Sequence, residues 1–137
     1  MKRRGWIAAA MGMPCTPDTC ALIDRLVAEM PRAELPADVP TLEQAIACFA
    51  ELGLGCNVEI KPCEGREAET ARVTVATLRR LWPAKLPAPL LSSFRDASLA
   101  AAREAAPEFA RALLIDDVKD DWQVRAEAVS AEDYSAG

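Results

Sequence analysis

The segment of residues 56–70, which reads CNVEIKPCEGREAET, begins with a short strand-like stretch that carries one carboxylate and one ammonium, Glu59 and Lys61. Glu59 and Lys61 are separated by one residue, so along an extended strand their side chains lie on the same face. A carboxylate can ligate a hard divalent cation through its oxygens, and an ammonium can contact a phosphate oxygen as a point charge. The pair therefore fits a metal-assisted phosphate site, but its spacing is also that of an ordinary solvated strand face.

Alternating helical and extended patterns indicate the elements that position this pair. Thr41 and Gln44 form a capping-box pattern at a helix start, and Gly53 and Gly55 end that helix. Asp96 is expected to cap a later helix, which Pro107 ends. The expected strands are 56–61, 90–94 and 111–115, and the expected helices are 21–30, 42–52, 66–82 and 97–106.

Short strands that alternate with helices of about 11 to 17 residues are typical of βαβ units, so the sequence predicts an α/β fold with a parallel sheet. Both faces of a parallel sheet are normally covered and apolar. A strand with Glu59 and Lys61 on one face is then unusual. In open α/β sheets and in barrels, the carboxyl ends of the strands are where ligands bind, which favours a chemical role for this pair.

Composition limits the classes of partner. The chain has 137 residues, 51% of them hydrophobic, and a formal net charge of −5. That charge argues against nucleic acid or an anionic membrane surface as the main partner. No segment approaches the apolar length that membrane insertion needs. An anionic small molecule remains a candidate ligand if a metal ion or a local cation supplies positive charge.

Cysteine and histidine usage argues against a zinc site. The five cysteines lack zinc-ligand spacing, and the sequence contains no histidine. Cys48 on a helix and Cys56 in a strand are expected to act as small buried hydrophobes. Reduced, structural thiols indicate a cytoplasmic location.

A longer stretch carries a family resemblance. The segment PTLEQAIACFAELGLGCNVEIKPCEGREAETA, followed by LLSSF, AAREAAPE and RALLIDD, resembles the glycerophosphodiester phosphodiesterase family, particularly its bacterial cytosolic branch. The resemblance covers about residues 36–122. It implies a (β/α)₈ TIM barrel, of which about half would be present, since such barrels take about 250 residues. It also implies hydrolysis of glycerophosphodiesters, as in glycerophospholipid metabolism, to an alcohol and glycerol 3-phosphate with bound Mg²⁺ or Ca²⁺.

The resemblance also assigns roles to individual residues. By position in the motif, Glu59 would be a metal ligand and Lys61 would contact the substrate phosphate. Ser93 and Phe94 would lie at the carboxyl end of the next strand, as candidates for lining the site or for ordinary strand-end packing. No catalytic residue is identifiable, because the family's acid/base groups are histidines and this sequence has none.

Residues outside the matched region lead to three alternatives for function. Residues 1–35 match none of the family's opening motifs. Residues 36–122 are expected to be a partial phosphodiesterase domain, and 123–137 are expected to be a tail, with one helix expected after Asp117. The chain would then be an internal fragment of such an enzyme, with weak activity or none. The alternatives are a non-catalytic half-barrel that self-associates through its open edges, or an unrelated small α/β domain.

Overall fold

The computed structural model describes residues 30–115 and 121–129. The chain divides into two compact units, and the boundary between them in the sequence falls between Thr41 and Leu42. In the first unit, the 3₁₀-helix η1 (Arg32–Glu34) is followed by a turn in which the Arg32 guanidinium donates to the Val39 carbonyl at 3.1 Å. The helix expected over 21–30 lies almost wholly outside the described residues.

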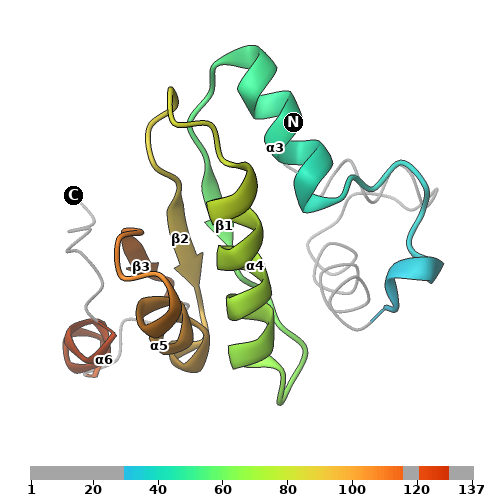
Figure 1. Cartoon of the computed structure of the whole chain (residues 1–137). Coiled ribbons are helices and arrows are strands. Elements are labelled where there is room, and N and C mark those ends of the chain that lie inside the picture. Colours follow the sequence, from blue (N-terminus) through green and yellow to red (C-terminus); the bar gives the residue numbers. More distant parts are fainter. Residues whose placement is uncertain (1–29, 116–120, 130–137) are drawn as a thin grey trace. The chain divides into compact units, whose positions relative to one another are not determined.

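The second unit contains the alternating elements that the sequence predicts (Figure 1). The helix α3 begins directly after Thr41, and Gly53 follows its end with a φ of +66°, a conformation that glycine adopts at little cost. The elements are α3 (Leu42–Leu52), β1 (Asn57–Glu59), α4 (Glu67–Leu81), β2 (Leu90–Ser93), α5 (Asp96–Ala105), β3 (Arg111–Leu113) and α6 (Trp122–Ala128).

The three strands form one parallel sheet in the order β1-β2-β3. The prediction of parallel pairing is therefore confirmed. Each strand is shorter than expected, and β1 ends at Glu59 although the Ile60 amide still donates to the Ser92 carbonyl at 2.7 Å. Pro62 has no amide hydrogen to donate, so the ladder does not continue beyond this point.

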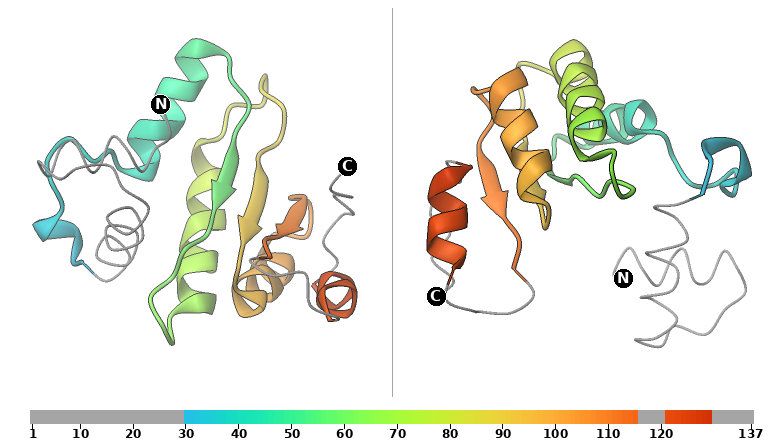
Figure 2. Two further views of the ribbon diagram at one scale, coloured as in Figure 1. Left: turned by 180° about the vertical axis from the view of Figure 1, so that it is seen from behind. Right: turned by 90° about the horizontal axis from the view of Figure 1, so that it is seen from below.

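The hydrophobic core lies between the sheet and two helices. Ile60 and Leu91 point to the face that α4 and α5 cover, where they pack with Ala71, Val75 and Leu78. In Figure 1 the helices α4 and α5 lie in front of the strands, and in the view from behind the strands lie in front of these helices (Figure 2). The two helices therefore cover the same face of the sheet.

Two apolar residues of the helices, Val73 and Cys48, are exposed. Val73 belongs to the apolar pattern of α4 but is 62% exposed, because the buried residues of the helix follow one stripe through Ala71, Val75 and Leu78 and Val73 lies off it. Cys48 was expected to be a small buried hydrophobe, which is wrong: it is exposed on α3, two residues after the buried Ile46. Position 48 therefore faces away from the packed side.

Asp96 does not cap α5. The residue at the cap is Arg95, which makes no side-chain capping bond, and Asp96 lies in the first turn of the helix. Its carboxylate instead accepts two bonds from the Arg125 guanidinium of α6, at 2.7 and 2.9 Å. Two parallel hydrogen bonds between a guanidinium and a carboxylate form a strong, charge-assisted pair. Here the pair connects α6 to the first turn of α5.

This ion pair gives a pH prediction. The bonds from Arg125 hold the pKa of the Asp96 carboxyl below its ordinary value. Because the folded pKa is lower than the unfolded one, the pair stabilises the fold above the unfolded pKa of about 3.9, and this contribution is lost as the pH falls through the folded pKa. Both side chains are partly exposed, so the effect on stability should be small.

A carboxyl-detected NMR titration measures this shift directly. In Arg125→Gln the Asp96 midpoint should rise toward the ordinary aspartate value, while Arg72→Gln, which alters an exposed arginine on α4, should leave it unchanged. An Asp96 midpoint that is the same in Arg125→Gln and in the wild type would contradict the assignment.

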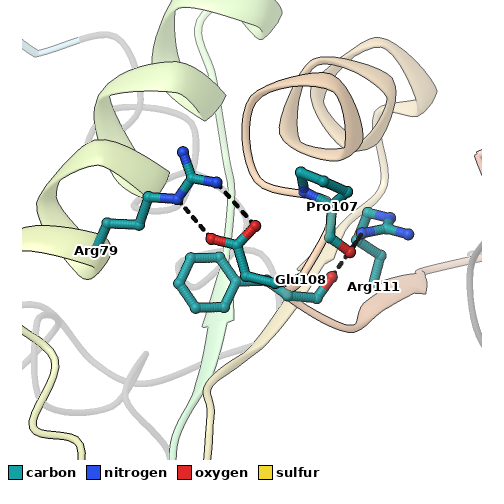
Figure 3. A network of polar contacts seen from close by, with 5 residues as sticks. Arg79, Pro107, Glu108 and Arg111 are labelled. Carbon is teal, nitrogen blue, oxygen red and sulfur yellow. Dashed lines mark hydrogen bonds and ion pairs between the residues drawn. The ribbon is translucent and has the colours of Figure 1, made fainter.

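Two further arginines hold the segment between α5 and β3 (Figure 3). The Arg79 guanidinium of α4 binds both carboxylate oxygens of Glu108, at 2.5 and 2.8 Å, which also lowers the pKa of Glu108. Arg111 is only 8% exposed and donates to three backbone carbonyls: Phe109 at 2.6 Å, and Pro107 and Val129 at 3.3 Å. Val129 follows α6, so Arg111 also fixes the end of that helix.

Candidate functional site at the strand ends

Glu59 is the last residue of β1, and Lys61 follows it two residues later, beyond the carboxyl end of the strand. Exposure alternates along this segment: Asn57, Glu59 and Lys61 are exposed, Val58 is half-buried and Ile60 is 2% exposed. Since Ile60 and Val58 pack toward α4 and α5, Glu59 lies on the opposite face of the sheet. The sequence spacing therefore correctly predicts that the carboxylate and ammonium avoid the core, and their assigned roles stay predictions.

The two residues expected at the end of β2 lie in different environments. Ser93 is fully buried, and its hydroxyl donates to the Ile60 carbonyl at 2.7 Å and accepts from the Arg95 amide at 3.1 Å. Phe94 is 37% exposed. The Ser93 hydroxyl is thus engaged by backbone groups on both sides, so it links the ends of β1 and β2. Whether either residue lines a ligand site stays a prediction.

Ser92 is a polar residue of this region that the sequence prediction does not single out. It is fully buried, and its hydroxyl donates to the side-chain carbonyl of Asn57 at 2.8 Å. The register pairs Ser92 with Glu59, so Ser92 lies on the Glu59 face of the sheet. The sequence signal that could have pointed to Ser92 is the pair of serines inside the otherwise apolar LLSSF. Adjacent strand residues point to opposite faces of the sheet, so each of the two buried hydroxyls needs its own hydrogen-bond partner.

The described residues do not form a complete metal centre. Within residues 30–115 and 121–129, no group of three or more aspartate, glutamate, cysteine or histidine side chains is arranged to hold a metal ion. Mg²⁺ requires near-octahedral oxygen coordination and Ca²⁺ takes six to eight oxygens. Glu59 alone supplies one carboxylate, so these residues fit part of a coordination shell at most.

Cations near the strand ends differ in their partners. Arg66, at the cap of α4, binds Glu69 through two bonds of 2.8 Å, and these bonds lower the pKa of the Glu69 carboxyl. Arg95, which directly follows Phe94, is exposed, and its guanidinium has no hydrogen-bond or ion-pair partner within the part of the chain that the structure describes. The two arginines therefore differ in whether the guanidinium is already engaged.

Comparison with solved structures shows which class of protein this chain is similar to. The chain is similar to an Oleispira antarctica phosphodiesterase that was solved in complex with the product sn-glycerol-3-phosphate, with 40% sequence identity and a TM-score of 0.63. The similarity covers 67% of this chain and 37% of that chain. No family model matches the sequence, and no curated protein matches it significantly.

The chain is therefore an α/β protein related to phosphodiesterases. Its strands are parallel, two helices cover one face of the sheet, and its sequence is 40% identical to that of a phosphodiesterase. The resemblance to the glycerophosphodiester phosphodiesterase family, which the PTLE and VEIKP motifs indicate, is confirmed by this similarity. The alternative of an unrelated small α/β domain is therefore wrong. Within the described residues, no helix is long and apolar enough to cross a membrane.

Proposed function

We propose that this chain carries part of the active site of a glycerophosphodiester phosphodiesterase, which hydrolyses a glycerophosphodiester to an alcohol and glycerol 3-phosphate. The observation that carries the proposal is the position of Glu59 and Lys61. Both are exposed at the carboxyl end of a parallel strand, in a chain 40% identical to a phosphodiesterase solved with sn-glycerol-3-phosphate. A (β/α)₈ arrangement and a cytoplasmic role in glycerophospholipid metabolism are part of the proposal.

The proposed roles follow from the chemistry of the two side chains. Glu59 would supply one oxygen ligand to Mg²⁺ or Ca²⁺, and Lys61 would contact a phosphate oxygen as a point charge. When bound, such a cation reduces the negative charge on the phosphoryl oxygens. The remaining ligands would come from beyond the described set, which lacks a cluster of three. Ser93 supports the pair by holding the Ile60 carbonyl between them.

Cation binding tests the role of Glu59. With a single carboxylate the wild-type chain should bind Mg²⁺ or Ca²⁺ weakly, and Glu59→Gln should weaken this binding at least about tenfold, equivalent to about 1.4 kcal/mol. Isothermal titration calorimetry measures the affinities. Glu64→Gln removes the same charge at an exposed position five residues further on and should bind like the wild type. Cation binding that survives Glu59→Gln would refute the assignment.

A non-catalytic, self-associating protein is the second candidate. It is favoured by the two outer edges of the sheet, at β1 and β3, which pair with no other strand among the described residues. Unpaired strand edges are templates for association with another chain. A chain that binds no cation and elutes as a dimer at all concentrations would favour this function over the first.

A further inference from the structure

The strand β1, which carries Glu59, is held to the sheet by few backbone bonds. It has three residues, and among the described strands it pairs with β2 alone. The bond from the Ile60 amide to the Ser92 carbonyl, at 2.7 Å, comes just before Pro62, which has no amide hydrogen to donate. Because the ends of weakly held segments open locally, contacts other than the ladder decide how firmly Glu59 is fixed.

Two buried hydroxyls of β2 supply such contacts on either side of Glu59 in the sequence. The Ser92 hydroxyl donates to the side-chain carbonyl of Asn57 at 2.8 Å. The Ser93 hydroxyl donates to the backbone carbonyl of Ile60 at 2.7 Å. Both serines are fully buried, and as neighbours in a strand they point to opposite faces of the sheet. The segment around Glu59 is therefore bonded to β2 two residues before and one residue after the carboxylate.

The bond between Ser92 and Asn57 lies on the same face of the sheet as Glu59. The register pairs Ser92 with Glu59, and Asn57 shares the face of Glu59 because the two are separated by one strand residue. This bond consequently connects the two strands directly beside the position from which the Glu59 side chain extends.

We propose that Ser92 and Ser93 are positioning residues for Glu59, whose hydroxyls hold the end of β1 so that the carboxylate is preorganised to bind a hard divalent cation. Neither hydroxyl contacts the cation. This inference rests on the proposed role of Glu59 as a cation ligand. A ligand that spends part of its time away from the binding geometry lowers the apparent affinity by that fraction, and a single carboxylate has few other protein ligands to compensate for it.

Titration of the full chain with Mg²⁺, followed by amide chemical shifts, tests this role. Ser92→Ala and Ser93→Ala should each weaken Mg²⁺ binding about two- to tenfold, the factor that corresponds to one net hydrogen bond.

Amide hydrogen exchange provides a readout that does not depend on the cation. In both variants the Ile60 amide should exchange about two- to tenfold faster relative to the amide of Leu91, which bonds to the Ala110 carbonyl at 2.9 Å in the central strand. The acceptor of the Ile60 amide is the backbone carbonyl of residue 92, which both substitutions retain. A faster rate would therefore report opening of the end of β1.

Two further variants serve as control and as alternative. Ser98→Ala removes a third fully buried hydroxyl, which donates to the Glu67 carbonyl at 3.3 Å and so connects α5 with α4. It should change neither the Mg²⁺ affinity nor the exchange ratio. Asn57→Ala removes the acceptor of Ser92 at an exposed position, so it tests the same bond if a buried substitution prevents folding. It should behave like Ser92→Ala.

The outcomes separate this inference from the proposed function. Wild-type affinity in the variants of positions 57, 92 and 93, with weakened binding in Glu59→Gln, would overturn the positioning role and leave that of Glu59 standing. A chain that binds no Mg²⁺, or binds it equally well in Glu59→Gln, would overturn both. Weakened binding with an unchanged exchange ratio, or an equal loss in Ser98→Ala, would overturn the positioning role.

Discussion

The purified 137-residue chain is expected to release glycerol 3-phosphate from glycerophosphocholine at the background rate, with Mg²⁺ or with Ca²⁺. Its sequence contains no histidine, and acid/base groups of that kind typically contribute about 10²- to 10⁴-fold to a rate. The described residues also lack a cluster of three metal-ligating side chains. Both absences affect the chemical step, so we expect a rate at least about 10²-fold below that of an enzyme that has such acid/base groups.

Other side chains do not replace the missing groups within the described residues. A carboxylate that acts as a general base at neutral pH needs a raised pKa. The carboxylates with shifted values, Glu69, Asp96 and Glu108, all have a lowered pKa, because each accepts hydrogen bonds from an arginine. They are weaker bases than an unpaired carboxylate and are occupied by structural ion pairs.

A coupled assay for released glycerol 3-phosphate measures this rate, with Glu59→Gln assayed beside the wild type. Equal, background rates in both proteins are the expected result. A clear metal-dependent rate that Glu59→Gln abolishes would contradict the prediction and would show that the chain contains acid/base groups other than histidine.

Substitution of Arg111 should have the largest effect on stability. Arg111→Ala is expected to lower the free energy of unfolding by about 2 to 4 kcal/mol, in the range for breaking a buried hydrogen-bond network. The guanidinium is 8% exposed and donates to the carbonyls of Pro107, Phe109 and Val129. Its removal leaves these acceptors without their donor and releases the end of α6.

Urea denaturation of Arg111→Ala and Arg111→Met measures the loss. Met retains an unbranched apolar chain of comparable length, so it restores packing but not the donors. We therefore expect Arg111→Met to remain strongly destabilised, and the exposed control Arg72→Ala to fall within about 0.5 kcal/mol of the wild type. Full recovery in Arg111→Met would show that packing, and not hydrogen bonding, is the main contribution of this side chain.

The sequence by itself determined the order of the elements and the face on which Glu59 lies. These depend on local patterns: a period of two along strands, an apolar stripe with helical spacing, and glycine or proline at the breaks. The motif around Glu59 and Lys61 also identified the related family, because it retains specific residues at fixed spacing. Strand lengths were overestimated, and for β1 the reason is Pro62, which has no amide hydrogen with which to continue the ladder.

Only the tertiary structure decided which polar groups meet. Asp96 has the residue type of a helix cap and was expected at that position, yet it lies in the first turn of α5 and binds Arg125, which is 29 positions further along the chain. Ser93 bonds to Ile60 across 33 positions, and this bond relates the ends of two strands. Helix and strand periodicities specify the direction of a side chain relative to its own element. The partner of that side chain depends on how elements far apart in the sequence pack against one another, which no local pattern records.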